Sequence, residues 1–365
     1  MDMETTKFAR ELHALEDHWH IKLPETFSRL YSAFEYPFIS PCEFLSLNAL
    51  IGDDDRWRGM LPQFLPFGED GDENYFGFYA PAAALGNDYA VLAWDHEYDH
   101  YYPVASSFEA FLKWCVIYGR YLAQDTFDEN TPEYEAEESQ RKEFANLVGL
   151  PPDLVTDALP RNDRELHERL LKADGQNAWA LSKLGSQFFG QGQIERARDC
   201  FVRASEAAPW FADPYYLLAE SYRVSGSELR ACRLWWQVFE SPIALSTRTT
   251  NYDLGNDHPE AEIYEAAACR CIECRSEVDA DLARGPLWDM LLKRDPFSPG
   301  PRFALADTLM QAGDSAGMER ELVNALTLAT EDRDISLAYE QLIEFYTRTG
   351  HVRDAALCRR DADLD

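Results

Sequence analysis

Apolar and polar positions divide the chain into two parts with different periods. Between residues 65 and 112, short aromatic and β-branched runs at 75–79 and 89–94 alternate with turn residues, and this pattern is typical of strands. Two serines then precede apolar side chains at 108, 111, 112 and 116, a spacing that predicts a helix packed on the sheet. The N-terminal part is therefore predicted to be α+β, with at least two antiparallel strands.

From Ala178 the apolar pattern changes to a repeat of about 34 residues, with small residues at repeat positions 8 and 20 and large ones at positions 4, 11 and 24. This pattern resembles the tetratricopeptide signature and predicts an all-α array of paired helices. The segment Arg164–Lys172 is an unpaired half repeat, and residues 246–264 fit no unit and are expected to be an insertion. The units begin at Ala178, Ala212, Glu265, Pro299 and Ser336.

The two patterns predict an α+β domain over residues 1–124 and a helical repeat domain over residues 162–365. Between them, residues 125–161 are rich in carboxylates and contain Pro132, Pro151 and Pro152. This segment is expected to be a solvated linker or a polar helix.

Net charge narrows the class of partner. The chain has 65 Asp and Glu against 34 Lys and Arg, which gives a net charge of −31, and both sides of Asp125 carry an excess of acids. Such a field repels nucleic acids and anionic membranes and attracts a cationic protein. The alternative is that the acidity only keeps the protein soluble. No run of 18 apolar residues and no signal peptide is found, so a cytoplasmic location is expected.

Cysteines and histidines are the candidates for chemistry. Most of the eight cysteines, such as Cys115, Cys200 and Cys232, lie in apolar helical patterns and are expected to be reduced thiols. The group Cys269, Cys271 and Cys274 lacks a fourth ligand at zinc-type spacing and is interpreted as packing. No metal and no cofactor are expected.

The segment Asp95–His100 contains two imidazoles and three carboxylates, which would suit a metal site or an acid–base pair. On a strand, however, His96 and His100 would lie on the face opposite to the acids, so a recognition surface is the preferred interpretation. Motifs of nucleotide-binding enzymes, serine hydrolases and zinc proteases are missing from the sequence. The chain is therefore not expected to be an enzyme, with His96 or His100 as the only catalytic candidates.

Residues 5–122 resemble the SUKH superfamily, which includes fungal cell-wall regulators and many bacterial immunity proteins. The resemblance rests on LPFG, an acidic glycine turn, NYFGFY, VLAWDHE and YYPVASSFEAFL, with Leu23-Pro24-Glu25-Thr26-Phe27 upstream. The sequence departs from the family pattern at residues 33–37, where AFEYP replaces a glycine-rich turn. The resemblance implies a helix before the sheet and, for bacterial members, binding and neutralisation of a toxin.

The resulting hypothesis is an immunity protein that neutralises a basic toxin, for instance a nuclease, by protein–protein contact. The alternative is a scaffold or regulatory adaptor that binds protein clients. In the repeats, the residue at position 9 is expected to line a concave groove. Glu220, Glu273, Asp307 and Glu344 occupy this position. The alternative interpretation is that these acids are only solvated. The predicted partner-binding residues are Asp70, Asp72, Glu73, Asp95, Glu97, Tyr98, Asp99, Tyr101 and Tyr102 in the first domain, and Glu220, Glu273, Asp307 and Glu344 in the groove.

Overall fold

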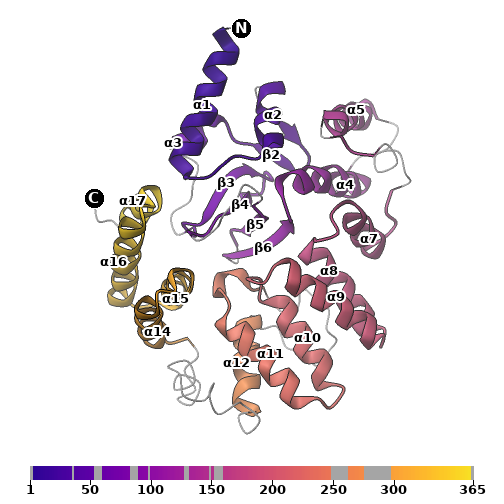
Figure 1. Cartoon of the computed structure of the whole chain (residues 1–365). Helices are drawn as coiled ribbons and strands as arrows, with labels where there is room; N and C mark the ends of the chain where they lie inside the picture. The colour runs from indigo at the N-terminus through magenta and orange to yellow at the C-terminus, as the bar shows by residue number, and fades with distance from the viewer. Residues whose placement is uncertain are drawn as a thin grey trace.

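The N-terminal part of the chain is an antiparallel sheet with helices, as Figure 1 shows. The computed structural model describes residues 3–34, 37–52, 60–82, 89–97, 99–126, 131–147, 149–151, 159–247, 262–274 and 297–362. The N-terminal elements are α1 (Met3–Trp19), α2 (Glu25–Ala33), β1 (Phe38–Ile39), β2 (Cys42–Phe44), α3 (Leu47–Gly52), β3 (Phe64–Glu69), β4 (Tyr75–Tyr79), β5 (Val91–Asp95), β6 (His100–Ala105), α4 (Phe108–Thr126) and α5 (Pro132–Leu147).

The six strands follow one another in the sheet in chain order, and every neighbouring pair is antiparallel. The predicted α+β class is confirmed. The helix expected at the Leu-Pro pair is α2, which begins directly after Pro24 and buries Phe27 and Leu30. The helix expected after the two serines is α4, where the Ser107 hydroxyl accepts a hydrogen bond from the Ala110 N–H (3.2 Å).

One face of the sheet is covered by helices of the same domain. Phe76 and Phe78 project from β4 toward α4, where Phe78 packs on Phe108 with 5.6 Å between ring centroids. Phe27 of α2 joins the same aromatic core, at 5.7 Å from Phe78. Burial of these rings, together with the aliphatic side chains around them, provides the hydrophobic stabilisation of this layer.

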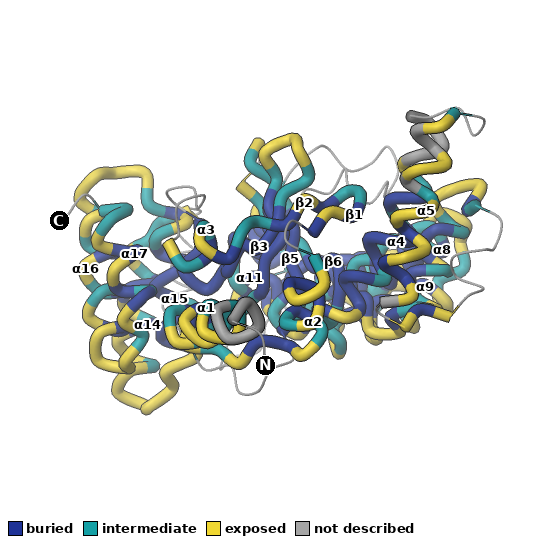
Figure 2. Tube along the Cα trace, turned by 90° about the horizontal axis from the view of Figure 1, so that it is seen from above, coloured by how far each residue is buried: buried dark blue, intermediate teal, exposed yellow. Residues whose placement is uncertain are grey.

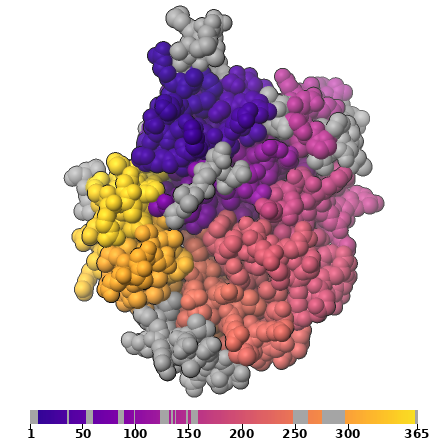
Figure 3. All heavy atoms as spheres, in the orientation of Figure 1, coloured from indigo at the N-terminus to yellow at the C-terminus, as the bar shows by residue number. Residues whose placement is uncertain are grey.

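The other face of the sheet is covered by the C-terminal helices. Leu92, Trp94 and Tyr101 project to this side, and they share one buried core with Leu322 and Leu342 of the helical region. Figure 2 shows the buried strands between helices on both sides, and Figure 3 shows the C-terminal helices in yellow against the N-terminal domain in indigo. The helical region therefore bends around the sheet and covers its second face.

The helical region consists largely of consecutive antiparallel helix pairs, which is consistent with a repeat architecture. Both α14 and α16 end at a glycine with positive φ, Gly313 (78°) and Gly350 (85°), a conformation that favours glycine as the helix terminator. The predicted insertion at 246–264 and the second half of the unit from Glu265 lie largely outside the described residues. The elements are α7 (Asp163–Ala173), α8 (Ala178–Gly190), α9 (Ile194–Ala207), α10 (Asp213–Arg223), α11 (Glu228–Glu240), η1 (Ile243–Leu245), α12 (Ile263–Glu273), α14 (Gly300–Ala312), α15 (Ser315–Leu328), α16 (Asp332–Thr349) and α17 (Val352–Asp361).

The acidic segment between the two parts contains the helix α5, which packs on β1 and α4. The buried Phe144 faces the first domain: its ring stacks on Phe34, with 6.4 Å between centroids. Glu138 accepts hydrogen bonds from Arg120 (3.3 Å) and Arg141 (3.0 Å), so one carboxylate joins α5 to α4. This part of the segment is a polar helix docked on the α+β domain.

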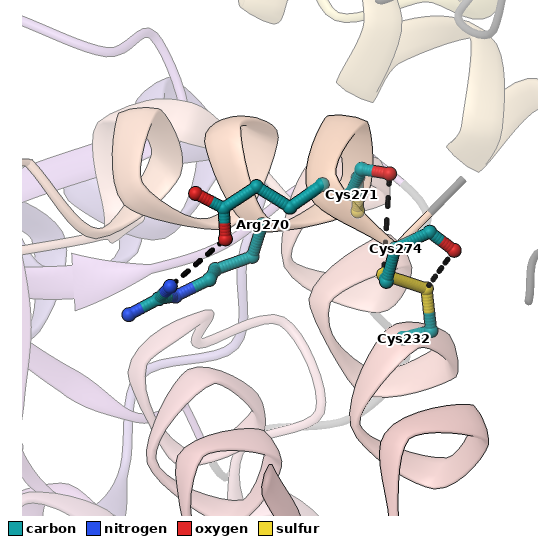
Figure 4. The surroundings of a disulfide bond; sticks show 5 residues. Cys232, Arg270, Cys271 and Cys274 are labelled. Carbon is teal, nitrogen blue, oxygen red and sulfur yellow. Dashed lines mark hydrogen bonds and ion pairs between the residues drawn. A yellow bond between two sulfur atoms is a disulfide. The ribbon is translucent and has the colours of Figure 1, made fainter. Parts of the chain in front are cut away.

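Two of the cysteines are bonded to each other, so the expectation of reduced thiols is wrong for this pair. A disulfide joins Cys232 of α11 to Cys274, the residue directly after α12 (Figure 4). The packing interpretation holds for Cys271, whose thiol is free and buried in the core of the helical region. The apolar helical pattern around Cys232 gave no indication of its partner, because helices that are adjacent in space bring together residues distant in sequence.

Alkylation in denaturant without reductant should modify six of the eight cysteines, and prior reduction should raise the number to eight. Mass spectrometry of the intact protein measures both numbers. In the Cys232→Ser variant all seven remaining cysteines should react without reductant, because Cys274 loses its partner. Eight modified cysteines in the unreduced wild-type protein would show that the bond does not form.

Candidate functional site

Two acidic hairpin turns meet at one end of the sheet. Because β4 pairs antiparallel with both β3 and β5, the turn after β3 and the turn after β5 lie at the same end. The turns are joined by the Asn74 side-chain oxygen, which lies 3.2 Å from the His96 N–H donor and 3.1 Å from His96 Nδ1. This end of the sheet is called the acidic rim, and its carboxylates are Asp70, Asp72, Glu73, Asp95, Glu97 and Asp99.

Three of the rim carboxylates shape the turns. Asp70 accepts hydrogen bonds from the backbone N–H of Asp72 (2.9 Å) and from the Asn74 side-chain amide (3.0 Å). Asp95 accepts a hydrogen bond from the Glu97 N–H (3.0 Å). Asp99 accepts a hydrogen bond from the indole of Trp94 (2.8 Å). Aspartates that bond to the backbone two residues onward are common turn formers, so Asp70 and Asp95 fix the shape of the rim, and Asp99 joins its turn to the Trp94 indole.

The remaining rim carboxylates, Asp72, Glu73 and Glu97, are exposed at the turn tips. Glu73 has φ of 63°, in the left-handed region that a glutamate adopts at a cost of about 1–2 kcal/mol. The turn geometry thus presents these three negative charges outward, where a partner can reach them.

The aromatic residues predicted for this surface behave differently from the carboxylates. Tyr101 is buried, and its hydroxyl oxygen accepts a hydrogen bond from the Leu61 N–H (2.9 Å). Tyr102 is half-buried and packs on Trp179 of α8, with 4.8 Å between ring centroids. The expectation that Tyr101 contacts a partner is therefore wrong. Tyr101 belongs to the buried core between the sheet and the C-terminal helices. Tyr98 lies outside the described residues.

The strand argument for residues 95–100 also needs correction. The strand β5 ends at Asp95 and β6 begins at His100, so His96 and Glu97 lie in a turn, where alternation between faces does not apply. Among the described residues, no group of three or more His, Cys, Asp or Glu is arranged to hold a metal ion.

The predicted groove residues do not form one exposed acidic surface. Glu220 is fully buried and pairs with Arg223 (2.8 Å) and Arg270 (3.5 Å), so its expected contact with a partner is corrected. By contrast, Glu273, Asp307 and Glu344 are exposed. Part of the inner surface of the helical region is occupied by the sheet domain itself, with α8 against β6.

Polar side chains at this internal interface were not identified from the sequence. The Asn177 side-chain amide donates to the Val104 carbonyl (2.6 Å), and Asp174 accepts from the Ser106 N–H (2.9 Å). Glu319 of α15 accepts from the Gln63 side-chain amide (3.0 Å). Such pairs of residues far apart in sequence leave no local pattern.

Comparison with known proteins supports the assignment of the first domain. Residues 9–114 match the model of the SMI1 / KNR4 family (SUKH-1). No curated protein matches the chain. The SUKH class is generally associated with immunity proteins. Within the part of the chain that the structure describes, no helix is long and apolar enough to cross a bilayer.

Proposed function

We propose that this chain is an immunity protein that binds a cationic toxin domain through the acidic rim and blocks it. The observation that carries the proposal is the meeting of the two acidic turns at one end of the sheet, held by the Asn74–His96 contacts. Both faces of the sheet are covered by helices of the same chain. The exposed tips Asp72, Glu73 and Glu97 are therefore the part of the sheet best placed for an external partner.

Electrostatics supports a basic partner. Toxins that act on nucleic acid need a positively charged face to hold phosphates. A chain with a net charge of −31 attracts such a face at long range and accelerates encounter by roughly 10- to 1,000-fold at low salt. Carboxylates at the rim would then occupy the phosphate-binding positions of the toxin and exclude its substrate.

The helical region has a supporting role in this proposal. We interpret its helix pairs as tetratricopeptide-type units whose inner surface is committed in part to the sheet domain of the same chain. The exposed Glu273, Asp307 and Glu344 lie on this region, away from the rim in sequence, and they favour the adaptor as the second candidate function. In the adaptor, these acids would recruit a separate protein.

Reversing charge at the rim should weaken partner binding. The partner is captured from the producing cells with the tagged wild-type chain, identified by mass spectrometry and used for binding kinetics. Asp72→Lys combined with Glu97→Lys should slow association by about tenfold or more at low salt, because both steering charges are inverted. Glu73→Gly removes a third charge without demanding a left-handed glutamate, so it should weaken binding while preserving stability.

The matched control is Glu206→Lys combined with Glu340→Lys, which makes the same change in net charge on exposed positions of α9 and α16. This control should retain most of the wild-type association rate. Equal slowing by both pairs would show that only net charge matters. Slowing by Asp307→Lys with Glu344→Lys, and none by the rim pair, would contradict the immunity proposal and support the adaptor.

A further inference from the structure

A ladder of aromatic rings runs along one face of α4 toward the acidic rim. Phe111, Trp114, Tyr118 and Tyr121 follow one another at helical spacing, with centroid distances of 5.7, 4.7 and 6.5 Å. Phe111 and Trp114 are buried, whereas Tyr118 and Tyr121 are half-buried. The ladder therefore starts in the core and ends at the surface.

The direction of α4 brings the surface end of the ladder to the rim. Phe108, at the start of the helix, packs on Phe78, whereas Trp114 packs on Phe76, which is closer to the hairpin turn. The C-terminal half of α4, with Tyr118, thus continues toward the end of the sheet where the acidic turns lie.

Carboxylates from separate parts of the chain converge on Tyr118. Burial raises the pKa of its phenol, and the charges of Asp163 and Asp70 raise it further. Asp163 is the first residue of α7 and accepts a hydrogen bond from the Tyr121 hydroxyl (2.6 Å). Asp70 belongs to the rim. The pKa of the neighbouring Tyr102 is also raised, first by burial and then by Tyr118, Asp95 and Asp70.

The arginines next to Asp163 are engaged with other acids. Arg161 pairs with Glu165 (2.6 Å), and Arg164 pairs with Glu168 (3.0 Å). The half-buried Lys183 interacts electrostatically with Asp163 and offsets part of its charge. The surface around Tyr118 thus combines half-buried aromatic rings with carboxylates whose charge the two arginines do not neutralise.

An aromatic ring flanked by carboxylates suits a guanidinium group. The planar cation stacks on the ring while its N–H groups donate to the acids, and it is more weakly hydrated than the ammonium of lysine. The same chain contains this arrangement: the guanidinium of Arg198 lies 4.3 Å from the Tyr222 ring centroid and pairs with Glu195 (2.7 Å).

We propose that Tyr118, Tyr121, Asp70 and Asp163 form an arginine-binding subsite beside the acidic rim, where a partner inserts a guanidinium group against the Tyr118 ring. The proposal rests on the proposed function, because it names the side chain that the cationic partner presents at this end of the domain. It adds a requirement that net charge alone does not impose, namely a preference for arginine over lysine.

The test measures binding of fluorescent nona-arginine and nona-lysine peptides to the full chain by anisotropy at physiological salt. The wild-type protein should bind nona-arginine about fivefold more tightly or better, since a partly desolvated cation–π contact contributes a factor of this order. Tyr118→Leu should abolish the preference, and Tyr118→Phe, which keeps the ring, should retain it. Asp163→Asn, at an exposed position, should reduce the preference without disturbing the core.

The control is Tyr215→Leu, which removes a half-buried tyrosine of α10 in the helical region. It should leave the preference unchanged. Equal affinity of the wild-type protein for both peptides, or equal losses in Tyr118→Leu and Tyr215→Leu, would overturn the subsite and leave only non-specific binding of polycations. If Tyr118→Leu does not fold, the Asp163→Asn variant provides the test of the subsite. An unchanged preference of this variant for nona-arginine over nona-lysine would overturn the proposal. Loss of the subsite does not prevent capture of a toxin through the rim, so failure of this proposal and failure of the proposed function are distinguishable.

Discussion

Arg302→Ala should lower the free energy of unfolding by about 3–5 kcal/mol, because it removes one partner of a fully buried ion pair. Arg302 and Glu321 are both fully buried, with Nη1 and Oε2 2.8 Å apart. The same guanidinium donates to the Phe239 carbonyl (2.6 Å) and to the Tyr264 hydroxyl (3.0 Å). One side chain of α14 thus connects α11, α12 and α15. Without it, Arg320 (2.8 Å) is the ion-pair partner that Glu321 retains among the described residues, and the Phe239 carbonyl and the Tyr264 hydroxyl each lose a donor.

Urea unfolding followed by circular dichroism measures the change. The double variant Arg302→Met with Glu321→Met is the matched control, because it removes both charges and keeps apolar volume at the contact of the four helices. Apolar replacement of a buried ion pair is often neutral or stabilising, so the double variant should unfold at a higher urea concentration than Arg302→Ala. If the double variant were the less stable of the two, the cost would come from lost packing and hydrogen bonds rather than from an unpaired charge.

The α+β domain was predictable because its local patterns agree with its final structure. Turn residues delimit the strands, the Leu-Pro pair precedes α2, and the serines precede α4. The second covered face of the sheet was missed, although the strands contain an indication of it. Leu92 and Trp94 alternate with Val91 and Ala93, so β5 is apolar on both sides. Strands that are apolar on both sides indicate a sheet buried on both faces.

The interpretation of Tyr101 as a partner-binding residue failed for the same reason. Aromatic side chains suit external recognition and internal packing equally well, and Tyr101 pairs with the second covering layer. At repeat position 9, Glu220 pairs with Arg223 of its own helix and with Arg270 of α12, and the second contact depends on how the helices stack. Long-range pairs such as Cys232–Cys274 and Tyr121–Asp163 are determined by the tertiary structure and leave no local pattern.

The acidic rim was predicted in part. The acids at 70–73 and 95–99 were identified from the sequence, and antiparallel pairing of the strands between them brings both turns to one end of the sheet. The different roles of these acids were not predictable, because Asp70 and Asp99 accept hydrogen bonds from Asn74 and Trp94 that only the folded hairpins provide.

The contact between the sheet and the C-terminal helices should weaken as pH rises from about 5 to 8, owing to Glu319. This carboxyl is buried and accepts hydrogen bonds from the Gln63 side-chain amide (3.0 Å), the Ala82 N–H (3.0 Å) and the Tyr346 hydroxyl (2.9 Å). Burial raises its pKa to about 7, and these three hydrogen bonds offset only part of that effect. Asp354 adds a further negative charge nearby.

A carboxyl whose pKa is higher in the folded state stabilises the fold below its unfolded pKa, and this stabilisation is lost as pH rises through the folded value. With 4.5 for the unfolded chain and about 7 for the folded protein, Glu319 should reduce the free energy of unfolding by about 2.5 kcal/mol between pH 5 and pH 8. Glu319→Gln cannot titrate, so its stability relative to the wild-type protein should increase by this amount over the same range.

The other titrating groups around Glu319 determine the controls for this measurement. Hydrogen bonding to Asp354 raises the pKa of His351 despite partial burial, so its stabilisation is also lost with rising pH and would add to the slope. Tyr79 and Tyr346 have raised pKa values, chiefly through burial, and stay neutral over this range. The difference in the free energy of unfolding between wild type and Glu319→Gln isolates the contribution of the carboxyl to the pH dependence. His351→Gln measures the contribution of the imidazole. Glu331→Gln, at an exposed position, should leave the pH dependence of stability unchanged. A constant difference between wild type and Glu319→Gln from pH 5 to pH 8 would mean that Glu319 keeps an ordinary pKa and that the interface tolerates its charge.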